Sequence, residues 1–100
     1  MTQAKVLIVE DDAGLREALV DTLLLGGYQV IEADSGEQAM IKLSEQSVDI
    51  VVSDIQMGGM SGLTLLKNIK NKYPNLAILL MTAYATIDDA VQAMRDGATD

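Results

Sequence analysis

The sequence predicts a single α/β domain organised around a parallel β-sheet. Three short, continuous apolar runs, at residues 6–9, 50–52 and 77–81, have the composition of strands that are buried on both faces. A further short strand is expected at residues 28–31, after a break at Gly26 and Gly27. Because segments with helical spacing separate the runs, we expect right-handed crossovers and helices on both faces of the sheet.

The helices are predicted from apolar residues that recur three or four positions apart. This spacing predicts four helices, around residues 15–23, 39–43, 66–73 and 87–94. Ser35 with Gln38 forms a capping-box pattern, in which each side chain bonds a free backbone N–H at the start of a helix. Thr86 with Asp89 repeats the pattern. Pro74 stands between the third helix and the last strand, where a residue that cannot continue a helix is expected.

Composition limits what this chain can do. With 100 residues, 49% of them hydrophobic, it can form one core. Its net charge of −8, without a lysine or arginine cluster, argues against direct binding of nucleic acid or of an anionic membrane. The absence of cysteine and histidine excludes thiol chemistry, a Ser-His-Asp triad and a histidine-ligated zinc site. Neither a signal peptide nor a membrane-spanning run is evident, so we expect a cytoplasmic domain.

Carboxylates follow two of the predicted strands. Glu10, Asp11 and Asp12 come after the first strand, and Asp54 comes after the strand at residues 50–52. Each has an ordinary interpretation: Glu10 and Asp11 as exposed strand-end residues, Asp12 as a helix N-cap. However, ligands bind at the carboxyl edge of a parallel sheet, and carboxylates crowded there repel one another unless a cation or protons separate them. The pattern therefore favours a site for a hard divalent cation.

Thr82 ends the last predicted strand, at the same edge as Asp54. It is either an ordinary β-branched strand residue or a hydroxyl that bonds a phosphoryl oxygen, with the backbone N–H of Ala83 beside it. No glycine-rich nucleotide motif occurs in the sequence. Several methionines are interpreted as packing residues rather than as ligands: Met57, Met60, Met81 and Met94.

Four short motifs in order make the chain similar to a known family. VEDD at 9–12, SDIQM at 53–57, MTAY at 81–84 and GATD at 97–100 together resemble the receiver domain of two-component response regulators, over essentially the whole chain. The resemblance implies a flavodoxin-like (CheY-like) doubly wound sheet with strand order 2-1-3-4. Residues 82–94 further resemble receivers of NtrC-type, sigma-54-dependent activators, and residues 1–12 are similar to flagellar regulators of the FlrC type.

The resemblance assigns roles to individual residues. It implies that Asp54 is the phosphoacceptor and that Thr82 binds the phosphoryl group and carries the switch. It also implies a Mg²⁺ site formed by Asp11, Asp54 and the backbone carbonyl of Gln56, with Glu10 acting through a metal-bound water. The expected partner is a sensor histidine kinase, since the chain has no histidine to act as the donor. The domain is thus expected to be a switch rather than an enzyme, and DNA and sigma-54 RNA polymerase would be contacted by downstream domains.

The family pattern also contains elements that this sequence does not reach. Receivers end with a fifth strand, which carries a lysine, and a fifth helix; the resemblance places both after Asp100, so that residues 1–100 are expected to be a receiver truncated at its C-terminal end. An exposed apolar edge at residues 78–81 is then expected, and we predict that the chain self-associates. Gly58 and Ser61 stand where the family usually has proline and often has aspartate.

Two other functions fit the same residues. One is a receiver-like module that signals by docking, without phosphorylation. The other is an aspartate-nucleophile phosphatase, which also forms an acyl phosphate. The phosphatases carry a D-x-D motif, whereas Asp54 is followed two positions later by Gln56, which cannot act as an acid or base.

Overall fold

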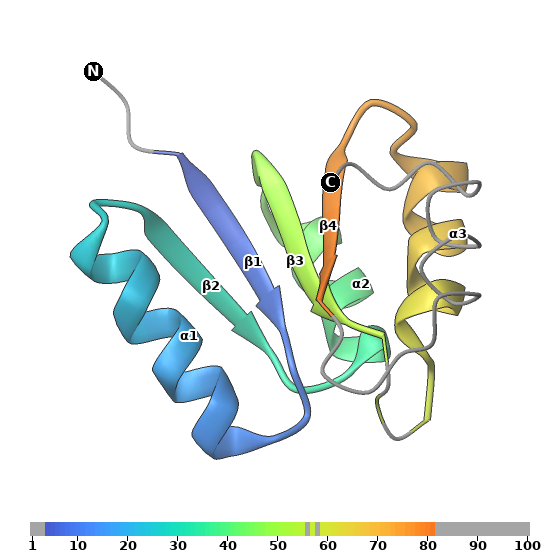
Figure 1. Ribbon diagram of the computed structural model, residues 1–100. Helices are drawn as coiled ribbons and strands as arrows, with labels where there is room; N and C mark the ends of the chain where they lie inside the picture. The colour runs from blue at the N-terminus through green and yellow to red at the C-terminus, as the bar shows by residue number, and fades with distance from the viewer. Residues whose placement is uncertain (1–3, 56, 58, 82–100) are drawn as a thin grey trace.

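The computed structural model describes residues 4–55, 57 and 59–81, and Figure 1 shows their arrangement. Strands and helices alternate from the beginning of this part to its end, as the apolar periodicity predicts. The elements are β1 (Lys5–Val9), α1 (Ala13–Leu25), β2 (Gln29–Ala33), α2 (Gly36–Glu45), β3 (Ile50–Asp54), α3 (Gly62–Lys72) and β4 (Ala77–Met81). The helix expected at residues 87–94, with its cap at Thr86 and Asp89, lies outside the described residues.

The four strands form one parallel sheet in the order β2-β1-β3-β4, which confirms the predicted strand order. β1 lies in the middle, where Leu7 pairs with Ile31 of β2 and with Val51 of β3. The central strands read as uninterrupted apolar runs because both of their faces are covered. All four strands end at the same edge, so the residues that follow β1 and β3 are brought together there.

Of the helices in the described residues, α2 and α3 pack on one face of the sheet and α1 on the other (Figure 1). α2 and α3 cover the face that carries Leu7, Val9 and Val51, and most of the fully buried side chains described belong to this layer. The buried residues of this core cluster are Leu7, Val9, Ala33, Ala39, Leu43, Val51, Leu65, Leu66, Ile69 and Ile78. Each buried leucine or isoleucine contributes about 1.5–3 kcal/mol of transfer free energy, so this layer contributes more to stability than the other face does among the described residues.

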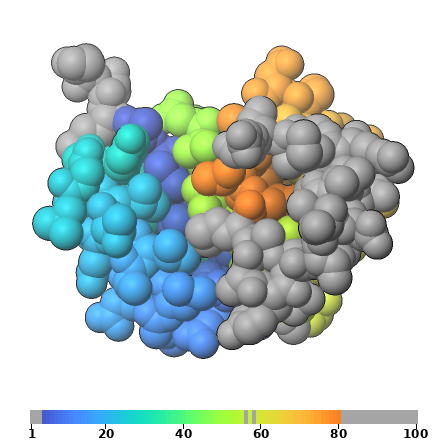
Figure 2. Space-filling view, in the orientation of Figure 1, coloured from blue at the N-terminus to red at the C-terminus, as the bar shows by residue number. Residues whose placement is uncertain are grey.

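α1 covers the opposite face more loosely. None of its residues is fully buried; Leu19, Val20 and Leu23 are partly buried against Val6 and Ile8 of β1. Beside the helix, atoms of β3 and β4 are visible in the space-filling view (Figure 2). The spacing predicted the position of this helix correctly, but its apolar stripe contributes less burial than the stripes of α2 and α3.

Side-chain caps begin all three described helices. Asp12 caps α1, Ser35 caps α2 and Ser61 caps α3, each accepting a backbone N–H bond three residues ahead. At α2 the capping-box pattern is only partly realised. Ser35 accepts the Gln38 N–H at 3.1 Å, but the Gln38 side chain accepts from the backbone N–H of Asp34, at 2.7 Å, rather than from that of Ser35.

The remaining turns agree with the residues that form them. Gly27, after α1, has a φ of 87°, a left-handed conformation that favours glycine. Pro74 follows α3 and precedes β4, as expected. β2 extends two residues beyond its predicted end, through Glu32 and Ala33. Glu32 is exposed at an edge of the described sheet and pairs with Arg16, so the strand accommodates its charge. Within the described part of the chain, no helix combines the length and apolar composition that crossing a membrane requires.

Candidate metal and phosphoacceptor site

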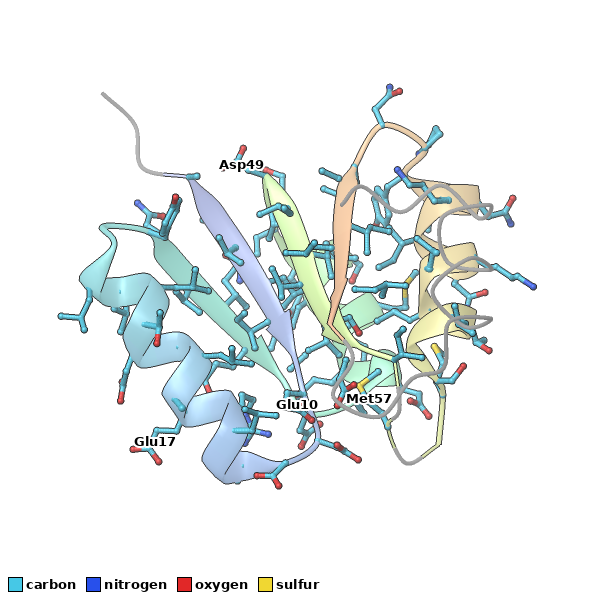
Figure 3. All side chains as sticks on the ribbon, in the orientation of Figure 1. Glu10, Glu17, Asp49 and Met57 are labelled. Atoms are coloured by element: carbon cyan, nitrogen blue, oxygen red, sulfur yellow. The ribbon has the colours of Figure 1, made fainter. Side chains whose placement is uncertain are left out.

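The register of the sheet brings three carboxylates together. Val9 pairs with Ser53, so the next residue on each strand, Glu10 after β1 and Asp54 at the end of β3, lies at the same level of the carboxyl edge. Glu10, Asp11 and Asp54 each offer an oxygen, and these three oxygens lie within 4.8 Å of one another. In Figure 3, Glu10 and Met57 lie at this end of the sheet and Asp49 lies at the other. The sequence predicted this meeting of carboxylates from the strand ends alone.

The three carboxylates differ in their exposure to solvent. Glu10 is only 1% exposed, so its ordinary interpretation as a water-exposed strand-end residue is wrong. Asp54 is half-buried and Asp11 is exposed. Asp12 stands apart from the cluster: its Oδ1 accepts the Leu15 N–H at 3.0 Å, which confirms its interpretation as a helix N-cap. The site therefore opens to solvent at Asp11 and closes toward the core at Glu10.

Glu10 is held by one of its two carboxylate oxygens. Oε2 accepts the backbone N–H of Asp12 at 3.2 Å, whereas the buried Oε1 has no hydrogen-bond donor among the described residues. The pKa of Glu10 is raised from 4.5 to about 7, chiefly by burial. The Asp12 N–H lowers the pKa, and the nearby carboxyl groups of Asp11 and Asp54 raise it further. A proton or a cation is thus needed to balance the charge at this edge.

The main chain of Asp54 is fixed by two neighbours that sequence reasoning missed. The Ser53 hydroxyl donates to the Asp54 carbonyl oxygen at 2.9 Å. Gly62, the first residue of α3, donates its N–H to the Ile55 carbonyl at 2.7 Å, and a Cβ at this position would overlap the Asp54 carbonyl oxygen. Only a residue without a side chain allows this approach, which places the start of α3 against the proposed phosphoacceptor. In the sequence, the only signal of this close approach was the presence of glycine at position 62.

The other predicted residues are placed only in part. Gln56 and Thr82 lie outside the described residues. Met57 and Met60 pack against the core cluster, which confirms their interpretation as packing residues. Met60 also fills the space beside Gly36 at the start of α2, where an added Cβ would lie 2.7 Å from the methionine sulfur.

The fold and the acidic edge can be compared with those of known proteins. The sequence profile of the response regulator receiver domain matches residues 6–100. The chain belongs to this family. The receiver fold predicted from the motifs is therefore confirmed.

Related curated proteins are much longer than this receiver. It is 55% identical over 97 residues to the response regulator protein FleR of Pseudomonas aeruginosa, covering 97% of this chain and 20% of FleR. It is 37% identical over 100 residues to the DNA-binding transcriptional regulator NtrC of Salmonella typhimurium, covering 100% of this chain and 21% of NtrC. The receiver thus spans about a fifth of the length of these curated relatives, and its predicted similarity to NtrC-type activators is confirmed.

Solved structures agree with this fold. The receiver superposes on a response regulator receiver protein from Pseudomonas putida with a TM-score of 0.94 at 30% identity, covering 100% of this chain and 84% of that chain. It superposes on NtrX from Brucella abortus with a TM-score of 0.93 at 29% identity, covering 99% of this chain and 22% of that one. The sheet order and helix placement are thus those of known receivers.

The residues of the acidic edge fit a magnesium ion. Carboxylate oxygens from the loop after β1 and from the end of β3 converge there. The buried Glu10 Oε1 lacks a donor among the described residues and is available to a cation or to its hydration water. Mg²⁺ prefers a small number of carboxylate ligands and retains several waters, which suits a site that is open on the Asp11 side.

Proposed function

We propose that this receiver accepts a phosphoryl group on Asp54 from a phosphohistidine of a sensor histidine kinase. The observation that carries the proposal is the convergence of Glu10, Asp11 and Asp54 within 4.8 Å at the carboxyl edge of a receiver fold. Residues 1–100 contain no histidine, so the donor imidazole has to lie outside them. The family match favours this reading over the aspartate-nucleophile phosphatases.

In the proposed transfer, a carboxylate oxygen of Asp54 attacks the phosphorus atom in line with the bond to the donor imidazole. An O–P bond forms, the P–N bond breaks, and the imidazole nitrogen keeps the electron pair. Ser53 and Gly62 hold the main chain of Asp54, so the attacking group is already positioned. Catalysis in such a transfer depends mostly on positioning and electrostatics.

Glu10, Asp11, Asp54 and the backbone carbonyl of Gln56 are proposed to hold Mg²⁺. When bound, Mg²⁺ supplies positive charge that offsets the charge of the phosphoryl oxygens. Without it, three carboxylates face an incoming anion. The pKa of Glu10 is raised chiefly by burial, and the carboxyl groups of Asp11 and Asp54 add to the rise. Thr82 is proposed to bond a phosphoryl oxygen and to pass the change on to the residues after it.

The receiver is proposed to control a sigma-54-dependent transcription activator in the cytoplasm. The class of activators proposed includes those of flagellar genes. Support comes from its similarity to FleR and NtrC, whose names describe a response regulator and a DNA-binding transcriptional regulator. The excess negative charge of residues 1–100 disfavours direct DNA contact, so DNA and sigma-54 RNA polymerase are assigned to other parts of a longer protein.

Self-association remains a proposal for the 100-residue chain. Within the described sheet β4 pairs only with β3, and its Leu79 and Leu80 are only partly buried. An apolar edge strand of this kind invites pairing with another chain. A concentration-dependent mass in light scattering is expected. A monomeric mass across the whole range would contradict self-association.

The test of phosphorylation is intact-protein mass spectrometry after incubation with acetyl phosphate and Mg²⁺. The chain is compared with Asp54→Asn and with a matched control, Asp21→Asn, which makes the same change on the exposed side of α1. We expect one phosphoryl adduct on the wild type and on the control, and none on Asp54→Asn. A version extended through the family's fifth strand and helix is measured in parallel. Absence of adduct from both lengths would favour the docking-only module.

A further inference from the structure

Arg16 makes a contact with the acidic edge that the proposed chemistry does not use. It lies in the first turns of α1, and its side chain reaches back to the end of β1. Its Nη1 donates to the backbone carbonyl oxygen of Glu10 at 2.8 Å, and its Nε donates to Glu32 Oε1 on β2 at 3.3 Å. The side chain is only 21% exposed. A positive charge is therefore held close to a site that is proposed to bind a cation.

The carbonyl that Arg16 contacts belongs to the peptide bond between two of the proposed metal-binding residues, Glu10 and Asp11. Because a peptide unit is planar, fixing this oxygen also fixes the direction of the Asp11 N–H and limits where both side chains begin. The preceding peptide is already fixed, since the Glu10 N–H donates to the Ala33 carbonyl at 3.1 Å. The hydrogen bonds of the sheet thus fix the peptide before Glu10, and Arg16 fixes the next one, between Glu10 and Asp11.

The guanidinium is itself anchored. Glu32 is paired across the sheet with Ile8, and Arg16 bridges this edge strand and the loop after β1 with two donors of one planar group. A lysine ammonium is a point charge on a flexible stem, so it does not reproduce this fork of two N–H donors in one plane. The two contacts together define one position for the guanidinium and, through it, one path for the loop.

We infer that Arg16 is a positioning residue for the metal site, holding the Glu10–Asp11 peptide so that their carboxylates converge with that of Asp54. This inference rests on the proposed Mg²⁺ site. It also predicts a change in Mg²⁺ affinity opposite to the change that simple electrostatics predicts. Removing a positive charge near a cation site should strengthen cation binding through Coulomb attraction, whereas removing a positioning contact should weaken it.

The test is Mg²⁺ binding by isothermal titration calorimetry, without any phosphoryl donor. Arg16→Met is compared with Lys72→Met, which makes the same charge change in the last turn of α3. We expect Arg16→Met to weaken Mg²⁺ binding about tenfold, the lower end of the range for residues that orient metal ligands. The control should bind as tightly as the wild type or slightly more tightly.

A second variant, Arg16→Lys, retains the charge and loses the fork, and it is also expected to bind Mg²⁺ more weakly than the wild type. In the metal-free protein, amide hydrogen exchange at Asp12, whose N–H is held by Glu10, should become faster in both Arg16 variants. Wild-type affinity, or tighter binding, in both variants would overturn the role of Arg16 while leaving the metal site intact. A wild type that binds no Mg²⁺ would overturn the metal site, and the inference with it.

Discussion

Glutamine at position 10 removes the ionisable group from the buried carboxyl while keeping its approximate size. In the folded protein the pKa of Glu10 is raised from 4.5 to about 7, chiefly because the side chain is buried. The folded state therefore binds this proton more tightly than the unfolded state. Glu10 stabilises the fold fully below its unfolded pKa, and that contribution is lost as the pH rises from about 4.5 to about 7.

The size of the effect follows from the two pKa values. Between about pH 5.5 and about pH 7.5 the free energy of unfolding should fall by about 2 kcal/mol through Glu10 alone. Other carboxylates also contribute to the pH dependence, since the net charge is −8. Their contribution is shared by the wild type and by Glu10→Gln, so the difference between the two slopes isolates Glu10.

The assay is urea unfolding followed by far-ultraviolet circular dichroism, at a series of pH values and without Mg²⁺. The wild type should lose about 2 kcal/mol more than Glu10→Gln across this range. Glu17→Gln, on the exposed side of α1 (Figure 3), is the matched control and should keep the wild-type slope. Equal slopes for the wild type and Glu10→Gln would refute the argument that burial keeps this carboxyl protonated. Added Mg²⁺ should stabilise the wild type more at the higher pH, because the metal competes with the proton.

Three further substitutions, two of them paired with a control variant, test the packing of the site and of the core by urea unfolding. Gly62→Ala places a methyl group against the Asp54 carbonyl oxygen and should cost about 1–3 kcal/mol; an unchanged midpoint would show that α3 can move away freely. Ile69→Ala opens a cavity at a fully buried position and should cost about 2–5 kcal/mol, in contrast to Leu25→Ala, where the side chain is 90% exposed and a change within about 0.5 kcal/mol is expected. Ser61→Ala removes the acceptor for the Thr64 N–H and should cost about 1 kcal/mol, whereas Ser61→Asp should retain the cap.

The fold could be predicted from the sequence because its signals are local. Continuous apolar runs mark strands buried on both faces, and helical spacing between them implies parallel pairing, which brings Glu10 and Asp54 to one edge. Strand and helix ends were predicted less well. β2 continues through Glu32, a charged residue whose partner, Arg16, lies 16 positions earlier in the sequence. Such a pairing cannot be predicted from the residues adjacent to Glu32 in the sequence.

The details of the site depended on contacts that the spacing of residues does not encode. Glu10 is buried by the residues packed around the end of β1, whereas a carboxylate at a strand end is more often exposed. No role was assigned to Gly62 from the sequence, although its approach to Asp54 requires the absence of a side chain. Both features arise from the packing of one backbone segment against another.

The loose packing of α1 has a consequence for how its sequence can vary. Its beginning is fixed by the Asp12 cap and by Arg16, but Leu24 and Leu25 near its end are 55% and 90% exposed. Since exposed positions have little influence on the free energy of unfolding, selection for a stable fold barely constrains them. Drift among related receivers should therefore accumulate along the outer side of α1, and any position there that resists drift would be retained for a reason other than folding.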